Sequence, residues 1–222
     1  MPILYREGVT TMQNKFELTK LFSSLVIGDG SFRSTGEFVW GQIAEHSDYV
    51  TMVWDEINKY GVECRINKRE AGIDKRGQRY KEFWTLNSRK LPIVDVLRER
   101  WYHEGRKTVS VHDVRNFGWK ELARWFMDDG TAPLYTKDLS RNGNMILCSH
   151  SFSEAENLLL QRVLYENFNL PFDVRKSNQY RYLFLKKKFS GEFYNGVKPF
   201  ILPSFEYKLR TIDPDSEYRV VR

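Results

Sequence analysis

The chain has 222 residues, enough for one large domain or two small fused domains. It is 41% hydrophobic and 29% charged with a net charge of +6, a globular composition that excludes a disordered chain and a membrane-embedded one. No apolar run approaches the ~20 residues that a bilayer span needs, and residues 1–20 lack a hydrophobic signal core. We therefore expect an intracellular protein that is not secreted and has no membrane partner.

The first half is predicted to begin with a helix over residues 14–30, which ends on Asp29-Gly30. A strand, a helix, two strand regions and a further helix are predicted to follow, at 37–45, 47–60, 62–67, 78–87 and 91–103. The second half begins with a helix over 118–130, which ends on Asp129-Gly130. A strand, a helix capped by Ser153, two strands and a final helical stretch are predicted at 144–152, 153–168, 172–176, 179–187 and 198–209.

The sequence is internally repeated. Its two Asp-Gly pairs are 100 residues apart, and the same order of elements follows each. The long helices also end alike, at Gly61 and Asn169, the residue types that most readily adopt a left-handed C-cap. We therefore predict an α+β fold of two αββαββα halves, residues 1–115 and 116–222, related by a pseudo-two-fold axis. Such symmetry suits two half-sites on a nucleic-acid duplex.

Positive charge is concentrated in two strand-like segments. Residues 65–90 hold nine Lys and Arg against three acids, and residues 173–188 hold six against one. Both segments alternate with period two, so we expect one apolar face on a core and one basic face that contacts phosphates and base edges. In the first segment the predicted apolar face is opposite the basic one, with Tyr80, Trp84 and Leu86 against Arg79, Lys81, Thr85, Asn87 and Arg89. In the second, the aromatic face is predicted to pack on the core, with Tyr180, Tyr182 and Phe184 against Gln179 and Arg181.

Each Asp-Gly pair places a carboxylate at the negative end of a helix, where it is disfavoured by ~0.3–1 kcal/mol. Taken singly, either pair is typical of a turn with a glycine C-cap. If the two helices pack side by side, Asp29 and Asp129 converge and need a compensating cation. Oxygen ligands point to Mg²⁺, whereas Cys64 and Cys148 are the only cysteines and lack zinc-binding spacing. Metals placed there, next to a phosphodiester, would support its hydrolysis, and no nucleotide cofactor is expected.

Residues 21–30, LFSSLVIGDG, and 121–130, ELARWFMDDG, resemble the two namesake helices of the LAGLIDADG homing endonucleases in their single-chain, intron-encoded form. The resemblance covers most of the chain and departs from the family's motif at Ile27 and Arg124. It implies a monomer whose two β-sheets form a saddle on double-stranded DNA, with the motif helices at the central interface. It also implies Mg²⁺-dependent cutting of both strands at a long asymmetric target, with Mn²⁺ substituting, in an organelle (mitochondrion or chloroplast) or a bacterial cytoplasm.

The resemblance also assigns site residues by position. The implied metal ligands are two carboxylates and two backbone oxygens, those of Asp29 and Asp129 and of Gly28 and Asp128. Two lysines are implied to stabilise phosphate charge or polarise water, Lys107 and Lys208. Two polar residues are implied to order water or phosphate near the metals, Gln42 and His150. Ten basic residues are candidates for DNA contact: Arg33, Arg65, Lys68, Arg69, Arg79, Lys81, Arg175, Lys176, Arg181 and Lys186.

Three alternatives remain open. Asp173 with Glu206 and Lys208 loosely matches the PD…ExK arrangement of restriction-type nucleases, which would move the site and leave the repeat unexplained. A maturase would bind host intron RNA and assist splicing, alone or in addition to cutting DNA, and a splicing assay beside a cleavage assay separates these functions. A DNA-binding regulator on the same scaffold would bind without cutting.

Overall fold

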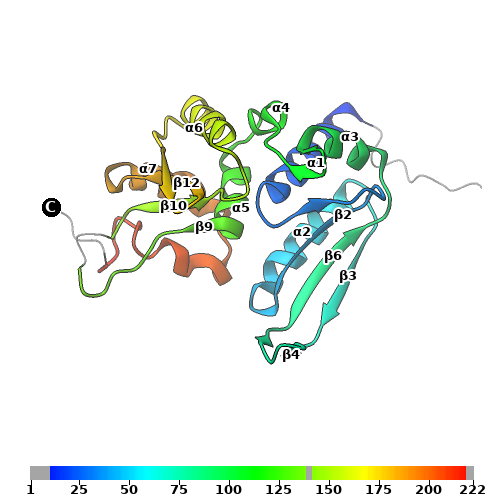
Figure 1. Ribbon diagram of the computed structural model, residues 1–222, viewed down its shortest axis with the longest axis horizontal. Helices are drawn as coiled ribbons and strands as arrows, with labels where there is room; N and C mark the ends of the chain where they lie inside the picture. The colour runs from blue at the N-terminus through cyan, green and yellow to red at the C-terminus, as the bar shows by residue number, and fades with distance from the viewer. Residues whose placement is uncertain (1–10, 139–141, 219–222) are drawn as a thin grey trace, which may run out of the picture. The chain divides into compact units, whose positions relative to one another are not determined.

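The computed structural model describes residues 11–138 and 142–218 (Figure 1). The chain forms two compact units that divide between Glu99 and Arg100. The repeat predicts a division at 115/116 instead. The two boundaries mark different things. The boundary of the repeat lies just before the second motif helix in the sequence, whereas the boundary of the compact units lies where contacts within one unit give way to contacts within the other.

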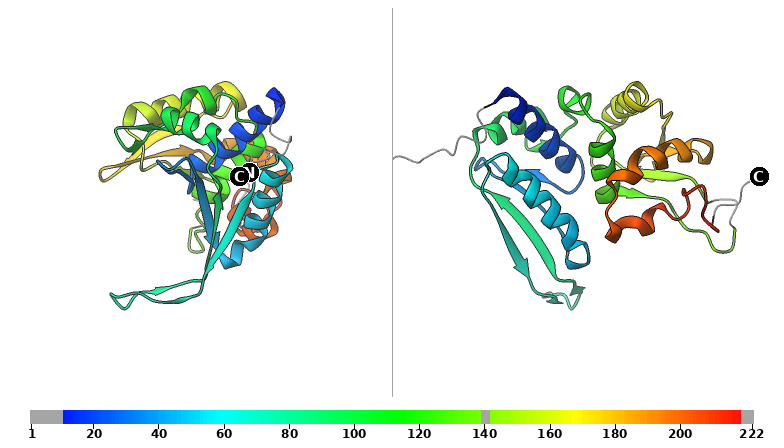
Figure 2. Two further views of the ribbon diagram at one scale, coloured as in Figure 1. Left: turned by 90° about the vertical axis from the view of Figure 1, so that its right-hand side faces the viewer. Right: turned by 180° about the vertical axis from the view of Figure 1, so that it is seen from behind.

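The first unit is a four-stranded antiparallel sheet with helices on one face (Figure 2). In chain order its elements are α1 (Met12–Val26), β1 (Ser31–Phe32), β2 (Phe38–Ile43), η2 (Ala44–His46), α2 (Ser47–Lys59), β3 (Cys64–Arg69), β4 (Gly72–Ile73), β5 (Arg79–Tyr80), β6 (Phe83–Ser88) and α3 (Pro92–Trp101), the last of which crosses the division. The strand order is β1-β2-β6-β3. The short strands β4 and β5 pair at the tip of the long β3–β6 hairpin, which extends beyond α2 (Figure 2).

The second unit repeats this architecture. In chain order its elements are β7 (Tyr102–His103), β8 (Arg106–Lys107), α4 (Val111–Val114), α5 (Trp119–Asp129), β9 (Gly130–Thr131), β10 (Met145–Cys148), α6 (Glu154–Phe168), β11 (Asp173–Ser177), β12 (Tyr180–Leu185), η4 (Lys187–Phe189), α7 (Ser190–Val197), η5 (Lys198–Phe200) and η6 (Pro203–Leu209). Its main sheet has the order β9-β10-β12-β11, which matches β1-β2-β6-β3 strand for strand. The predicted α+β fold with duplicated antiparallel sheets is confirmed.

Local capping signals place the long helices where the sequence predicts them. The Ser153 side chain accepts a hydrogen bond from the Glu156 amide and caps α6. Gly61 after α2 and Asn169 after α6 both have positive φ, 73° and 54°. These left-handed residues end both helices alike, as the repeat predicts.

Aromatic packing joins each motif helix to other elements of its own unit. The ring of Phe22 in α1 stacks on Phe38 in β2 at 4.4 Å between centroids. In the second unit, Phe126 of α5 meets Phe193 of α7 edge-on at 5.1 Å. These contacts fix the end of each motif helix, and therefore its Asp-Gly pair, over its own unit.

The helical stretch predicted near residues 198–209 needs correction. The α-helix lies earlier, at α7, and the predicted segment forms the two short 3₁₀ segments η5 and η6. Pro199 and Pro203 lie in these segments. Proline has no amide hydrogen to donate to the preceding turn, so an α-helix cannot run through both positions.

Among the residues that the structure describes, no helix is long and apolar enough to cross a membrane.

Candidate active site

Asp29 follows the C-terminal end of α1, where the Gly30 amide donates to the Leu25 carbonyl at 2.8 Å. The carboxylate is exposed, and its Oδ2 accepts a hydrogen bond from Nε2 of Gln42 at 3.0 Å. Gln42 lies in β2 and is only 8% exposed. A buried amide therefore orients an exposed carboxylate, and two residues singled out from the sequence are brought together.

Asp129 is the last residue of α5 and is half-buried. The neighbouring residue that sequence reasoning missed is Cys148 in β10. Burial raises the pKa of its thiol, the negative charge of Asp129 raises it further, and the positive charge of Lys208 lowers it. The strand register places Cys148 beside this acid, because Leu147 pairs with Gly130, the residue after Asp129. Burial alternates along β10, and Cys148 comes directly after the buried Leu147. This alternation in the sequence is the signal that could have placed Cys148 on the face opposite the core.

The glycine of each Asp-Gly pair is required by close approach and not by a left-handed turn, which corrects the interpretation of a single pair as a glycine-capped turn. Gly130 has extended backbone angles, φ −85° and ψ 149°. A Cβ there would lie 2.0 Å from Cδ2 of Phe126, and one on Gly30 would lie 2.8 Å from the Leu25 carbonyl oxygen. Only glycine lets the chain fold back over the last helical turn and begin the next strand.

Lys208 supplies positive charge at the C-terminal end of α5. Its Nζ donates to the backbone oxygens of Met127 at 2.6 Å, Phe126 at 3.3 Å and Asp128 at 3.4 Å. The last turn of α5 contains no basic residue of its own. A lysine from η6 therefore offsets the negative end of the helix next to the Asp129 carboxylate.

Lys107 lies in β8, opposite Tyr102 in β7, and is half-buried. It belongs to the second unit, as Lys208 does, while Asp29 belongs to the first. Its catalytic role stays a prediction.

His150 is exposed in the turn that follows β10, and its ring lies 5.3 Å from that of Tyr180 and 6.3 Å from that of Tyr182. The strand registers align Ser31–Val39 with Thr131–Ile146, so three residues further on Gln42 corresponds to Ser149. His150 is one residue beyond Ser149, and successive residues of a strand point to opposite faces, so His150 does not take the place of Gln42. His150 is thus held by the tyrosines of β12, and its part in ordering water stays a prediction.

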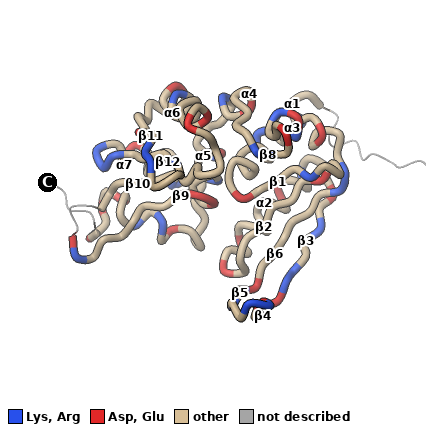
Figure 3. The backbone as a smooth tube through the Cα atoms, in the orientation of Figure 1, with Lys and Arg blue, Asp and Glu red and all other residues tan. Residues whose placement is uncertain are grey.

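The first unit presents a basic, polar surface on the face of its sheet opposite α2, which we call the first open face. Residues directly opposite in neighbouring strands share a face, and Arg65 pairs with Asn87, and Asn67 with Thr85. Leu86, between these β6 residues, is fully buried on the other side. The first open face thus comprises the residues of β3 and β6 that alternate with Leu86, together with their partners in β2: Arg65, Asn67, Arg69, Phe83, Thr85, Asn87, Val39, Gly41 and Ile43. Figure 3 shows Lys and Arg along β3 and at the β4–β5 tip.

The prediction for β12 is wrong in its orientation. Leu183 and Leu185 are fully buried and define the core side, so Tyr180, Tyr182 and Phe184 lie on the opposite face. Arg181 shares the leucine side and pairs with Glu154 of α6 at 2.7 Å. Both faces of β12 are rich in apolar residues, so periodicity alone cannot decide between them. The leucines carry no polar atom and take the dry side, while tyrosine hydroxyls remain in water.

Two more candidates for DNA contact also lie on the helix-covered side of their sheets. Lys176 pairs with Arg181 in the register, and Lys68 pairs with Trp84, over whose ring its Nζ sits at 3.7 Å. Arg65, Arg69 and Arg175 lie on the open faces, and their contact with DNA stays a prediction. The remaining candidates are in loops, at strand ends or in the hairpin tip: Arg33 beside Glu37, Arg79 in β5, Lys81 paired with Glu45, and Lys186 paired with Asp173.

The donors around Asp29 and Asp129 fit a hard divalent cation. The carboxylates and the backbone oxygens of Gly28 and Asp128 are oxygen donors, which Mg²⁺ and Mn²⁺ prefer. Within residues 11–138 and 142–218, no cluster of three or more His, Cys, Asp and Glu is arranged to bind a metal. A cation at either acid would therefore depend on backbone oxygens, water and substrate phosphate as further ligands.

The residues of the PD…ExK alternative are held by different partners. Asp173 pairs with Lys186 at 3.2 Å, and Glu206 pairs with Lys198 at 2.8 Å. Lys208 is directed to the carbonyls of α5. A shared site built from these three residues is not supported by their contacts.

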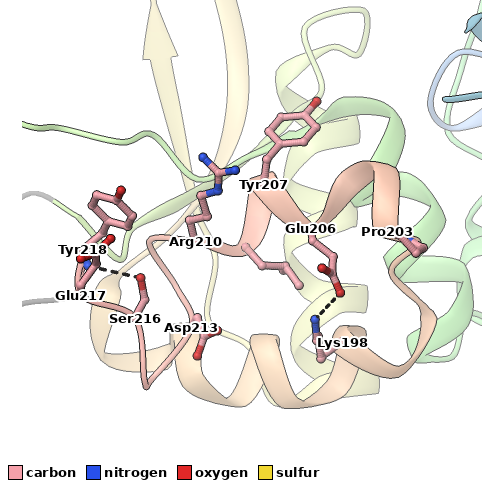
Figure 4. Close-up of a pocket in the computed structure, with 10 residues that line it drawn as sticks. Lys198, Pro203, Glu206, Tyr207, Arg210, Asp213, Ser216, Glu217 and Tyr218 are labelled. Carbon is pink, nitrogen blue, oxygen red and sulfur yellow. Dashed lines mark hydrogen bonds and ion pairs between the residues drawn. The ribbon is translucent and has the colours of Figure 1, made fainter. Parts of the chain in front are cut away.

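A cavity of about 850 Å³ lies among η5, η6 and the C-terminal segment (Figure 4). Its wall includes the ion pair of Lys198 and Glu206, which raises the pKa of the lysine. Glu206 of the PD…ExK alternative lines the cavity, but none of the residues that the resemblance assigns to the site does, so the cavity is separate from the candidate active site.

Known structures share this fold. Over 92% of this chain and 90% of the other, the structure superposes on the homing endonuclease I-WcaI bound to its DNA recognition sequence, with a TM-score of 0.74 and 22% identity. The chain is 30% identical over 221 residues to an uncharacterized protein of Methanocaldococcus jannaschii, covering 94% of this chain and 82% of that protein. It is also 25% identical to the DNA endonuclease I-ChuI of Chlamydomonas applanata, covering 85% and 92%.

The duplicated α+β units, each with an Asp-Gly pair at the C-terminal end of its motif helix, α1 or α5, define a protein of the DNA endonuclease class. The model of the LAGLIDADG DNA endonuclease family matches residues 23–193. The chain belongs to this family, and the resemblance of its two motif helices is confirmed.

Proposed function

We propose that this protein is a site-specific endonuclease that cuts both strands of a long, asymmetric DNA duplex with Mg²⁺, for which Mn²⁺ can substitute. The observation that carries the proposal is the equivalent position of Asp29 and Asp129 at the C-terminal ends of α1 and α5, the helices that precede the corresponding strands β1 and β9. The hydrogen bond from Gln42 supports it further, because the amide presents the Asp29 carboxylate outward. A protein that only binds DNA has no need of two acids at negative helix ends.

Each site residue has a separate task in this proposal. Asp29 and Asp129 hold the metals, with the backbone oxygens of Gly28 and Asp128 as further ligands. The bound metals would supply an activated water and stabilise the departing oxygen. Gln42 fixes the orientation of the Asp29 carboxylate at 3.0 Å. The ammonium of Lys208 offsets the negative charge that the end of α5, the Asp129 carboxylate and a nearby phosphate would bring together.

The remaining predicted residues complete the proposal. Lys107 stabilises phosphate charge at the other strand, and His150 orders water or phosphate on the side of the second unit. The repeat units 1–115 and 116–222 act as one monomer, so that the two acids and the two sheets of one chain serve one duplex. The proposed place of action is inside the cell, in an organelle or a bacterial cytoplasm.

Cleavage assays on single-acid variants test the proposal. A library of plasmids with randomised inserts is incubated with the protein and Mg²⁺, and the linearised members identify the target. Asp29→Asn and Asp129→Asn should bind this target but cut it about a hundredfold more slowly or worse, because the metal ligand is lost. Asp55→Asn, a change at an exposed position of α2, is the matched control and should cut normally. Undiminished cutting by either acid variant would refute the proposed site.

The alternative functions predict other outcomes of the same experiments. A maturase would accelerate splicing of its host intron RNA, with or without cutting the intronless DNA. A regulator would bind one duplex selectively and linearise none. Comparing splicing, binding and linearisation with one protein preparation therefore separates the three functions.

A further inference from the structure

The two sheets present different chemistry on the faces that their helices leave uncovered. The second open face is the side of β10, β12 and β11 opposite Leu183 and Leu185. Its register pairs Ile146 with Phe184 and Cys148 with Tyr182. The same face holds aromatic rings, one aliphatic side chain and few charges: Ile146, Cys148, His150, Asp173, Arg175, Tyr180, Tyr182 and Phe184.

The aromatic groups of the second open face form a continuous surface. Tyr180 is 47% exposed, and the exposed ring of His150 lies against it and against Tyr182. At the other end, the guanidinium of Arg175 lies 3.3 Å from the centre of the Phe184 ring. This stacking spreads the arginine flat over an apolar group.

The first open face also holds an aromatic ring, that of Phe83, so charge distinguishes the two faces more clearly than ring content does. The first open face carries Arg65 and Arg69 and no acid. On the second, Arg175 is the one arginine or lysine within the described strands β10, β11 and β12, and Asp173 of the same face pairs with it at 3.7 Å and with Lys186, just after β12, at 3.2 Å. The second face is therefore close to neutral and has little free positive charge for phosphates.

The second open face is continuous with the candidate active site. Leu147 pairs with Gly130, the residue after Asp129, and the next residue of β10, Cys148, pairs with Tyr182. A duplex whose phosphodiester is cut at Asp129 would therefore run over Cys148 and Tyr182. The aromatic surface lies along the path of the substrate in the proposed function.

A DNA duplex limits what an aromatic surface can recognise. Its bases are stacked on one another, so side chains in the major groove meet only base edges. The apolar group exposed there is the C5-methyl of thymine, whereas purine edges offer hydrogen-bond donors and acceptors that suit Arg and Asn. The chemistry of each open face thus matches a different feature of the groove.

We infer that the two half-sites of the target are read by different chemistry. The first open face reads purine edges through Arg65, Asn67 and Arg69. The second reads thymine methyl groups through Tyr180, Tyr182 and Phe184. The inference rests on the proposed function and adds the sequence specificity of the enzyme. We expect the half-site over the second unit to be rich in thymine and its binding to depend little on salt.

Replacing thymine with uracil tests this, because the change removes the methyl group and leaves base pairing intact. Binding of the selected target is measured without divalent metal, so that no cutting occurs, with uracil in one half-site at a time. In one half-site the Kd should rise about fourfold for each methyl that is lost. In the other half-site uracil should have little effect.

Variants assign that half-site to the second unit. Tyr182→Ser and Tyr180→Ser should weaken binding of the thymine target and abolish most of the uracil penalty, with the salt dependence unchanged. Arg65→Ala should keep the rise in Kd that uracil causes. It should also reduce the slope of log affinity against log salt by about one, because a cation that contacts a phosphate is lost. Tyr165→Ser is the matched control, an exposed tyrosine of α6 in the same unit, and should behave as wild type. Thermal unfolding verifies that each variant is folded, and Tyr180, the more exposed of the two tyrosines, carries the test if Tyr182→Ser does not fold.

Three results would overturn the inference. The first is an equal uracil penalty in both half-sites or in neither. The second is a full penalty that persists in folded Tyr180→Ser. The third is loss of single-stranded oligonucleotide binding in these variants while duplex binding is kept, which would indicate base stacking. A target that is cut normally but insensitive to uracil refutes only this inference, whereas failure to cut any duplex refutes the proposed function as well.

Discussion

Lys208 Nζ lies 2.6 Å from the backbone oxygen of Met127, in the last turn of α5. The lysine is far along the chain, in η6, yet it occupies the place where a helix would normally carry its own basic residue. Two acids at the negative ends of helices need positive charge nearby to compensate them. In the second unit, the ammonium group of Lys208 supplies part of this positive charge.

Lys208→Met should therefore destabilise the protein even without DNA. The substitution removes a charged donor from three carbonyls, which should lower the free energy of unfolding by about 1–2 kcal/mol. Urea denaturation measures the change. Lys176→Met, at an exposed position of β11, is the control and should have an effect below about 0.5 kcal/mol. Equal effects of the two substitutions would show that the carbonyl contacts do not stabilise the fold.

Gln42→Leu should impair cutting more than binding. The leucine fills a similar volume but cannot donate to Asp29, so the carboxylate loses its fixed orientation. Loss of such an orienting partner typically costs ~10–100-fold in activity or metal affinity. Single-turnover cleavage and a binding titration measure the two effects separately. Gln13→Leu removes the same type of bond, from an exposed amide to Glu17, and should leave the cleavage rate unchanged.

Gly130→Ala should destabilise the second unit. The added Cβ would meet the Phe126 ring at 2.0 Å and its carbonyl oxygen at 2.5 Å, and the rigid helix end leaves little room to move. Overpacking of this kind costs about 1–3 kcal/mol. Gly118→Ala, whose Cβ would come no closer than 3.3 Å to any atom, should cost less. Thermal unfolding ranks the two, and a reversed order would contradict the close-approach explanation.

Glu156 should make stability depend on pH in the acid range. Burial opposes its charge, but hydrogen bonds from Ser153, Arg106 and the Val109 amide prevail and lower its pKa below the ordinary value of 4.5. A group with a lowered folded pKa stabilises the protein above its unfolded pKa, and this contribution is lost as pH falls through the folded value.

Glu156→Gln should therefore be less stable than wild type near neutral pH, and the difference should shrink as pH falls below about 4.5. Melting temperatures recorded across this range measure it. Glu166→Gln, an exposed position on the same helix, supplies the comparison and should give a difference that is small at every pH. A Glu156→Gln difference that grows in acid would show that the carboxylate is not stabilised by these donors.

The duplication and the helix ends were predictable because their causes are local. A left-handed cap needs Gly or Asn, as at Gly61 and Asn169, and an N-cap needs a short polar side chain, as at Ser153. The pairing of Gln42 with Asp29 could be anticipated only through the family resemblance, since the two residues lie in different elements.

The amino-acid sequence by itself determined the repeat, the order of helices and strands, and the two acids at equivalent helix ends. Tertiary packing alone decided which side of β12 faces water, because Leu183 and Leu185 compete with an equally regular row of aromatic rings for the space under α6. It also decided that Lys208 reaches the carbonyls of α5 and that Cys148 adjoins Asp129. Such contacts join residues far apart in the chain, and alternation along a strand carries no information about which helix will cover it.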